Sequence, residues 1–156
     1  KVTNIFKNTN LRIAFQTTNT IWQLLNIKKK QPNIYTNSGV YSIKCSTCNR
    51  FYIGQTGQHI YTKFKEHIRY IRTNNPKSAF AVHILENNHQ YDTMEESLRL
   101  ITPCNKGNRL NLLENLYIQQ FHNLGLLMDE QCTFEYNTLF SQFKTRAPLY
   151  IHDSAF

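Results

Sequence analysis

Residues 39–54 read Gly-Val-Tyr-Ser-Ile-Lys-Cys-Ser-Thr-Cys-Asn-Arg-Phe-Tyr-Ile-Gly. Residues 40–43 and 51–53 are rich in β-branched and aromatic side chains, which is the composition of short β-strands. The seven residues from 44 to 50 are enough to reverse the chain between them. The stretch therefore predicts an antiparallel β-hairpin whose loop carries a Cys-x-x-Cys pair.

Hydrophobic spacing beyond the hairpin predicts three helices and one more strand. In residues 58–72 apolar positions recur at steps of three and four, which marks one face of an amphipathic helix. A second helix is expected to begin at Asn75-Pro76, because asparagine can cap a helix and proline is preorganised at its first position. Residues 97–101 have strand composition, and residues 108–124 form a third helical pattern. The order β-β-α-α-β-α predicts a small α/β domain.

These elements set the expected boundaries along the chain. Residues 38–125 are predicted to form the domain, and residues 1–37 a linker or an extension of a preceding domain. Residues 126–156 are predicted to be a C-terminal extension that packs back on the domain through Phe134, Tyr136, Leu139, Phe140 and Phe143. On the helix at 108–124, the residues expected to face the core are Leu110, Leu113, Leu116, Tyr117, Phe121 and Leu124.

The chain is basic, and its charge is unevenly placed. Eighteen Lys and Arg against 10 Asp and Glu give a net charge of +8. Residues 1–30 hold six basic residues and no acid, and residues 44–77 hold seven basic residues and one acid. Such clusters favour a polyanionic partner, because neutralised phosphates release counterions; the alternative is an ordinary basic protein with solvated lysines. No apolar run is long enough to span a membrane, and no signal peptide is recognised.

Four residues have the chemistry of a zinc site: Cys45, Cys48, His83 and His89. Zinc takes four sulfur and nitrogen ligands in a tetrahedron, and four protein ligands leave no open position for water. The predicted zinc is therefore structural and holds the hairpin loop. The alternatives are a reduced surface turn for the cysteines and a buried core position for His83. The two other cysteines, Cys104 and Cys132, are expected to be ordinary reduced thiols.

The tyrosines of the hairpin lie in two glycine-containing motifs, Gly39-Val40-Tyr41 and Tyr52-Ile53-Gly54. These motifs resemble the paired motifs of the GIY-YIG nucleases. With a cysteine pair between the motifs and two later histidines, the chain is similar to the endonuclease domain of Penelope-like retroelements. Residues 1–37 resemble the segment that follows the reverse transcriptase there. The resemblance implies a nuclear enzyme that nicks DNA, leaving a 3′ hydroxyl from which a covalently linked reverse transcriptase copies a template RNA.

The resemblance also implies catalytic roles. Tyr41 and Tyr52 match the family's two tyrosines, one of which helps to deprotonate the attacking water while the other positions the water or the phosphate. Glu114 matches the glutamate that holds the catalytic Mg²⁺ or Mn²⁺. Lys63 stands where the family has an arginine, which keeps the charge but loses the planar fork. His67 resembles the histidine that often follows that arginine and is assigned a supporting role, with zinc ligation as the alternative.

The residues themselves leave two functions open. Glu114 lies inside the apolar stripe of its helix, where a carboxylate is costly to bury unless it is paired or holds a metal; the alternative is a stripe edge open to solvent. We expect a zinc-containing, Mg²⁺- or Mn²⁺-dependent DNA endonuclease. The rival is a zinc-stabilised DNA-binding module without useful catalysis, because Lys63 replaces the arginine. Residues expected to contact DNA phosphates are Lys44, Arg50, Lys65, Arg69 and Arg72.

Overall fold

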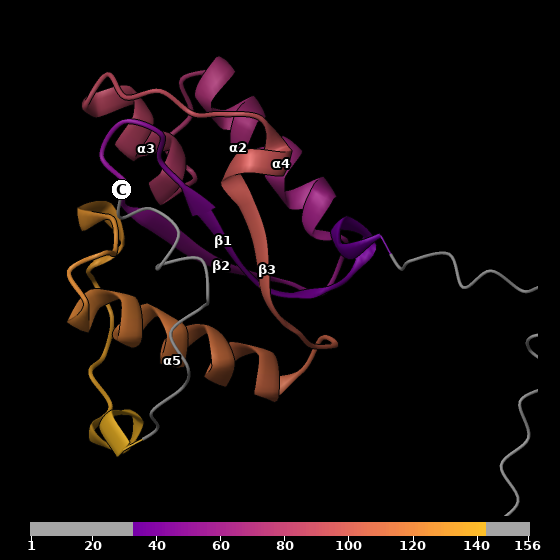
Figure 1. Ribbon diagram of the computed structural model, residues 1–156, viewed down its shortest axis with the longest axis vertical. Coiled ribbons are helices and arrows are strands. Elements are labelled where there is room, and N and C mark those ends of the chain that lie inside the picture. Colours follow the sequence, from indigo (N-terminus) through magenta and orange to yellow (C-terminus); the bar gives the residue numbers. More distant parts are fainter. Residues whose placement is uncertain (1–32, 143–156) are drawn as a thin grey trace, which may run out of the picture. The chain divides into compact units, whose positions relative to one another are not determined.

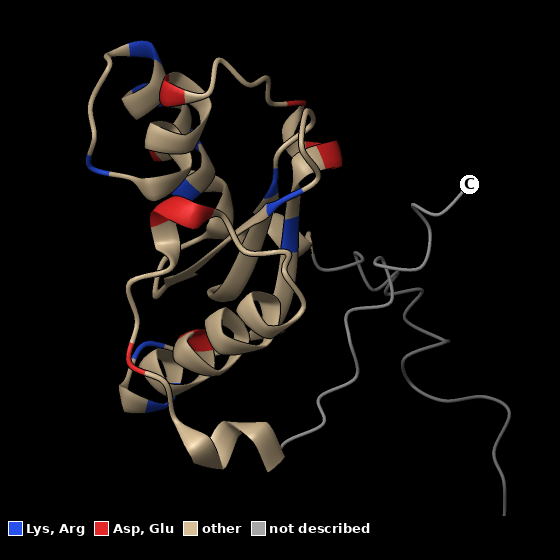
Figure 2. Cartoon of the chain, turned by 90° about the vertical axis from the view of Figure 1, so that its left-hand side faces the viewer, with Lys and Arg blue, Asp and Glu red and all other residues tan. Residues whose placement is uncertain are grey.

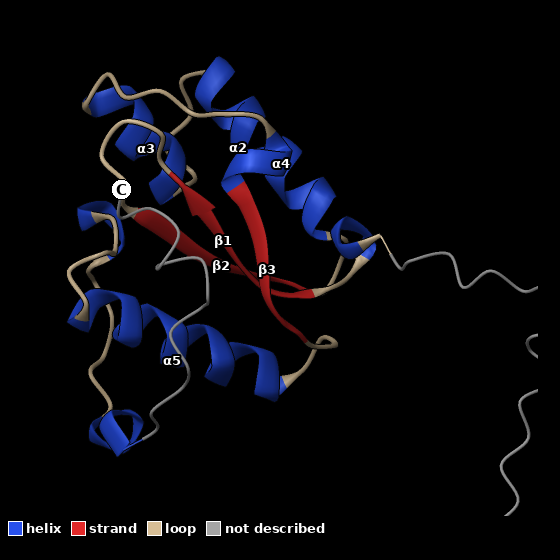
Figure 3. Cartoon of the chain, in the orientation of Figure 1, coloured by secondary structure: helices blue, strands red, loops and turns tan. Residues whose placement is uncertain are grey.

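The computed structural model describes residues 33–142, so the expectations for residues 1–32 and for Phe143 lie outside the described residues. The described helices and strands, shown in Figure 3, are β1 (Gly39–Lys44), β2 (Phe51–Thr56), α2 (Ile60–Arg72), α3 (Ala79–Glu86), α4 (Met94–Ser97), β3 (Leu98–Pro103) and α5 (Asn108–Asn123). Short 3-10 helices are η2 (Ile34–Thr36), η3 (Asp129–Gln131) and η4 (Thr138–Gln142). No helix in this part of the chain is long and apolar enough to cross a membrane.

A three-stranded antiparallel sheet of order β2-β1-β3 forms the centre of the domain. β1 and β2 pair directly, with Tyr41 opposite Gly54 and Ile43 opposite Tyr52, so the predicted hairpin is confirmed. β3 pairs along the other side of β1, with an irregularity between Val40 and Tyr41. The predicted small α/β domain is confirmed at this level.

The two faces of the sheet are covered by different helices, because side chains alternate along each strand. Tyr41 and Ile43 of β1 point into a core shared with α2 and α3, which also contains Phe64 and Phe80. Val40 points to the other face, into a core shared with α5. Figure 1 shows the sheet between α2 and α3 on one side and α5 on the other. The sheet therefore presents its two motif tyrosines to the α2–α3 side.

The chain after α5 runs along the outer edge of β2. The Phe51 amide donates to the Leu126 carbonyl at 2.8 Å, and the Met128 amide donates to the Phe51 carbonyl at 3.0 Å. Leu127 and Met128 are buried. In the predicted C-terminal extension, Phe134 packs against the α5 core, and Phe140 is half-buried. Two residues expected to pack back, Tyr136 and Leu139, are instead exposed.

Helix ends differ from the expectation at two places. α3 begins at Ala79, because the Ser78 side chain accepts from the Ala81 amide and caps the helix. Asn75 instead accepts from the Lys77 amide at 3.1 Å, which makes a turn before the helix. At the end of α5, Leu124 is exposed rather than inward, because the helix stops at Asn123 and the chain turns away. The short helix α4 was not predicted; its single turn is too brief to give a period.

Candidate metal centre and active site

The hairpin loop and the end of α3 bring together the four predicted zinc ligands. Their ligand atoms all lie within 4.8 Å of one another. Cys48 Sγ is 3.3 Å from His83 Nε2, and Cys45 Sγ is 3.6 Å from His89 Nδ1. Tetrahedral zinc with ordinary Zn–N and Zn–S bonds needs ligand atoms roughly 3.3–3.8 Å apart. The group of two sulfurs and two nitrogens could therefore hold a metal such as zinc.

The Glu130 carboxylate contacts one of these four residues, His83, on the ring nitrogen that faces away from the group. Nε2 of His83 faces the other ligand atoms, so Nδ1 carries the proton and donates to Glu130 Oε2 at 2.9 Å. Asn87 Nδ2 donates to the other oxygen of Glu130 at 3.0 Å. A carboxylate behind a metal-binding histidine fixes the ring orientation and raises its basicity. Glu130 was not predicted, because it lies in η3, far from the ligands in sequence.

Replacing Glu130 with alanine should weaken zinc binding by roughly 10–100-fold, because His83 loses the partner that fixes its tautomer. Competition with a chromogenic zinc chelator measures the affinity. Glu135→Ala is the matched control, since Glu135 is exposed and close in sequence. Equal zinc affinity in the parent and Glu130→Ala would show that the carboxylate plays no part in the metal centre.

The second cluster joins the two motif tyrosines to His67. Tyr41 Oη lies 2.8 Å from His67 Nε2, and His67 Nδ1 lies 2.6 Å from Ser78 Oγ. The Tyr52 and His67 ring centres are 4.9 Å apart, and the two tyrosine ring centres are 6.3 Å apart. His67 is not one of the residues of the Cys/His group. Its two ring nitrogens contact Tyr41 and Ser78 instead of lying with the four possible zinc ligands. Tyr41 is buried, whereas Tyr52 is half-buried.

Two motif glycines are required by close approach. A Cβ at Gly54 would lie 2.8 Å from Tyr41 Oη and 2.8 Å from Tyr52 Cε1, so any side chain there would separate the two phenols. Gly39 has φ +151°, and a Cβ there would lie 2.2 Å from the Thr102 carbonyl oxygen on the neighbouring strand. Steric contacts thus explain why both motifs contain glycine. Gly54 leaves space for the two tyrosine rings, and Gly39 allows the close approach of β1 and β3.

Burial dominates the electrostatics of this cluster. It raises the pKa of Tyr52 to about 12, with a further contribution from the nearby Glu114 carboxylate. Burial also raises the pKa of Tyr41 well above its ordinary value, and Tyr52 and Glu114 add to the effect. The pKa of His67 is lowered to about 4, first by burial and then by the charge of Lys63. At neutral pH both phenols are therefore protonated and the imidazole is uncharged.

The buried His67 should make the free energy of unfolding depend on pH. Below pH 6.5 the histidine of the unfolded chain gains a proton, whereas the folded one does not until about pH 4. The unfolded state then binds more protons, so stability present above pH 6.5 should fall by up to about 3 kcal/mol as the pH drops to 4. Urea unfolding of the parent and of His67→Gln, in excess zinc at each pH, measures the contribution of His67. Protonation of the zinc ligands affects both chains equally, so the difference between them is due to His67. The same pH slope in both would contradict the buried, neutral state of His67.

Glu114 approaches the tyrosines from α5 and is held by β2. Gln55 Nε2 donates to Glu114 Oε2 at 2.8 Å and to Asn111 Oδ1 at 2.8 Å. Partial burial raises the pKa of Glu114, and the hydrogen bond from Gln55 opposes that rise. The carboxylate is half-buried, which lies between the two predicted alternatives. Gln55 directly follows the second motif, and its role was not predicted.

Lys63 lies on α2 near His67 and is already paired. Its Nζ contacts Glu66 Oε2 at 2.6 Å, one turn along the helix. The proximity to His67 appears in the electrostatics, since the lysine charge lowers the pKa of His67. The lysine therefore lies near the tyrosine cluster and forms an ion pair with Glu66.

The five residues expected to contact DNA differ in their surroundings. Arg50 forms an ion pair with Asp129 and donates to the Leu127 carbonyl at 3.1 Å, so it binds the chain's own C-terminal segment. Lys44 is half-buried at the end of β1. The remaining three, Lys65, Arg69 and Arg72, line a pocket on α2.

Comparison with known proteins adds no further assignment. No family model, curated protein or solved structure matches the chain. The interpretation of the site therefore depends on its own residues and contacts.

Proposed function

We propose that the chain is a GIY-YIG-type DNA endonuclease domain of a Penelope-like retroelement, acting in the nucleus beside a linked reverse transcriptase. One observation carries the proposal. The residues that the sequence motifs single out come from β1, β2, α2 and α5, and they form one electrostatically coupled cluster around Tyr41, Tyr52 and His67. The Glu114 charge raises the pKa of Tyr41 and Tyr52, and the Lys63 charge lowers that of His67, so both charges act on this cluster.

The proposed reaction hydrolyses one DNA phosphodiester. Water attacks phosphorus and the bond to the 3′ oxygen breaks. The cluster accepts the proton of the attacking water, and the departing 3′ oxygen takes a proton from solvent to become the 3′ hydroxyl. Tyr52 is the half-buried phenol, and a hydrogen bond links it to Tyr41, which in turn contacts His67 Nε2. Because the phenols are protonated, Tyr52 acts as a base by passing its own proton toward His67 as it accepts one from water. Ser78 and the two ring nitrogens let the imidazole change tautomer.

Glu114 is the residue that fits a catalytic metal. Magnesium and manganese prefer oxygen ligands and are often held by one or two carboxylates together with substrate phosphate. Gln55 donates to Glu114 Oε2 at 2.8 Å and so orients the carboxylate. Bound there, the ion would supply positive charge to the phosphoryl and leaving oxygens.

Affinity for DNA is expected to depend strongly on residues 1–32. Residues 33–142 hold ten basic and nine acidic side chains, and Figure 2 shows both kinds interspersed over them. Residues 1–32 carry six basic residues and no acid. Since phosphate neutralisation supplies most of the non-specific affinity, this segment is the main candidate for contacts with the DNA backbone.

A second function is favoured by one observation, the ion pair between Lys63 and Glu66. A paired lysine has less charge to offer a transition state than a free arginine fork. The chain would then be a zinc-stabilised DNA-binding module with little catalysis. The two functions share the metal centre and the basic segments, and they differ only in whether DNA is cut.

Nicking of supercoiled plasmid in Mg²⁺ or Mn²⁺ tests the proposal. Glu114→Gln should reduce nicking by about 10²-fold, because the change removes the charge that holds the metal while keeping the size of the side chain. Glu135→Gln is the matched control and should nick at the parental rate. If Glu114→Gln nicks as fast as the parent, Glu114 is not the metal ligand; if no chain nicks, the DNA-binding module is the better description.

A further inference from the structure

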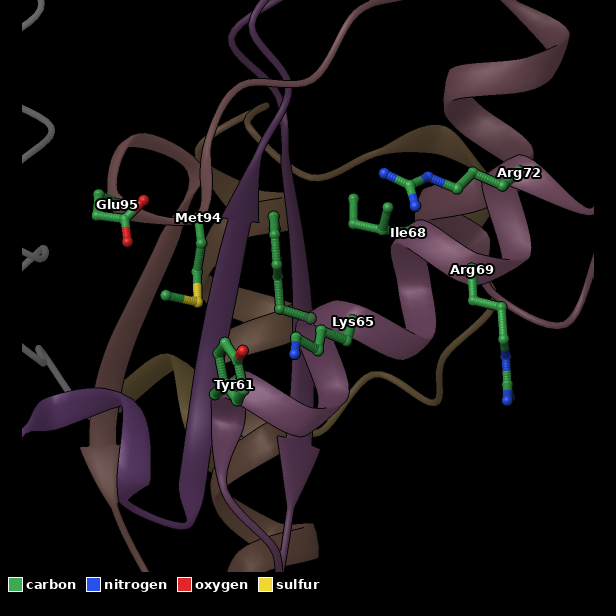
Figure 4. A pocket seen from close by; sticks show the side chains of 8 residues that line it. Tyr61, Lys65, Ile68, Arg69, Arg72, Met94 and Glu95 are labelled. Atoms are coloured by element: carbon green, nitrogen blue, oxygen red, sulfur yellow. The ribbon is translucent and has the colours of Figure 1, made fainter.

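An open pocket of about 580 Å³ lies between α2 and α4, outside both the Cys/His group and the tyrosine cluster. We call it the α2–α4 groove. Phe64 and Ile68 of α2 and Met94 of α4 give it an apolar floor. In Figure 4, Arg72 extends above Ile68 toward the groove, and the Lys65 amine lies beside the Tyr61 ring. An apolar floor beneath a cationic rim is the chemistry of this surface.

The cations of the rim lack acidic partners within the described chain. The ion pairs found in residues 33–142 join Arg50 to Asp129, Lys63 to Glu66 and His83 to Glu130. The three cations beside the groove, Lys65, Arg69 and Arg72, take part in none of them. Instead, the Lys65 amine lies 4.2 Å from the centre of the Tyr61 ring.

The groove faces away from the proposed reaction centre. At 100° per residue, Lys65 points about 160° from Lys63 around α2, and Arg72 points about 180° from it. Lys65 and Arg72 are exposed, whereas His67 is buried against the sheet. A molecule in the groove would therefore leave Tyr52 and Glu114 uncovered.

We propose that the α2–α4 groove binds an acidic amphipathic helix of a partner protein. Apolar side chains of that helix would cover Phe64, Ile68 and Met94, and its carboxylates would pair with Lys65 and Arg72 at the rim. These two cations are two helical turns apart, about 10 Å along α2. Carboxylates spaced by about two turns on the partner would match them.

Other occupants fit the groove less well. Single-stranded nucleic acid binds by stacking on open aromatic faces, and in the groove Lys65 lies over one face of the Tyr61 ring. The chain's own terminal segments have the wrong charge, since residues 1–32 contain no acid and residues 143–156 contain only Asp153. Charge and apolar surface together favour the acidic helix.

Fluorescence anisotropy with the full chain tests the proposal at physiological salt. The probe is a labelled peptide of about 14 residues with leucines at i, i+3, i+4 and i+7 positions and glutamates elsewhere. A matched peptide with lysines in place of glutamates measures charge selectivity. The acidic peptide should bind at least tenfold more tightly than the basic one, and the double variant Lys65→Glu/Arg72→Glu should weaken it at least tenfold. Met94→Gln should weaken it at least threefold through the floor.

The control is Lys77→Glu/Arg109→Glu, which makes the same change of charge outside the groove and should alter the Kd less than twofold. If this control weakens the peptide as much as the groove variant, the attraction is only that of a basic protein, and the proposal is wrong. Failure of the acidic peptide to bind also overturns it. So does an oligothymidylate that binds in its place and is lost with Lys65→Glu/Arg72→Glu, since the groove would then be a nucleic-acid site. Lys65→Gln/Arg72→Gln repeats the test if the reversed charges disturb folding.

Discussion

Cys48→Ser should release zinc from the chain and lower its melting temperature by about 10–20 °C. The Cys48 sulfur is one of four possible ligand atoms that lie within 4.8 Å of one another, and serine is a poor zinc ligand. Because the ligands come from the hairpin loop and from the end of α3, binding of the metal is coupled to folding of both. Elemental analysis measures the zinc, expected at one per chain, and calorimetry measures the melting temperature.

Cys104→Ser is the matched control for this change. Cys104 is a half-buried free cysteine outside the Cys/His group, so its replacement should leave the zinc content unchanged. A chelator should bring the parent to the melting temperature of Cys48→Ser and leave Cys48→Ser unaffected. The zinc assignment would be wrong if the parent chain contained no zinc and the chelator did not change its melting temperature.

Lys63→Arg should raise plasmid nicking by at least about tenfold while leaving DNA affinity nearly unchanged. Lys63 offers a single charged atom, and Glu66 contacts it at 2.6 Å. A guanidinium has five donors, so it can keep Glu66 and still present a fork to phosphate oxygens. Arginine fingers elsewhere in phosphoryl transfer contribute about 10³–10⁵ in rate, which bounds the gain. The gain should appear in the rate because the fork acts on charge that develops in the transition state.

Lys65→Arg controls for this variant, because it makes the same change on the same helix but on the opposite face. It should not raise nicking. Glu114→Ala in the Lys63→Arg background should abolish the gain, since the catalytic metal would lose its protein ligand. A Lys63→Arg chain that binds DNA and metal normally yet nicks no faster would refute the assignment of Lys63, whereas equal nicking by the double variant would refute that of Glu114.

Local sequence patterns were enough to predict the hairpin and the metal group. The hairpin has short strands of strong β composition and a loop of the right length, and the direct pairing of Tyr41 with Gly54 follows from them. The Cys-x-x-Cys spacing and two later histidines predicted the four atoms that converge. In both cases the residues that carry the information are close in sequence or have specific chemistry.

The hydrogen-bond partners of the site histidines were not predicted, because no local sequence pattern indicates them. Glu130 contacts His83, which is 47 positions away, and Ser78 contacts His67 from a neighbouring helix. Both are common polar residues whose roles appear only when the fold brings the elements together. The start of α3 was wrong for a related reason. Asn75 and Ser78 can both cap a helix, and the structure uses Asn75 for a turn.

The segment after α5 has a consequence for the behaviour of the protein at high concentration. A strand at the rim of a sheet offers free amides and carbonyls on which another chain can pair. Here Leu126 and Met128 occupy the amide and carbonyl of Phe51, and the Gln131 side chain accepts from the Ile53 amide and donates to the Ile53 carbonyl. Residues 126–131 therefore cover this edge of β2 and oppose edge-to-edge aggregation. A chain shortened before residue 126 would lose this protection.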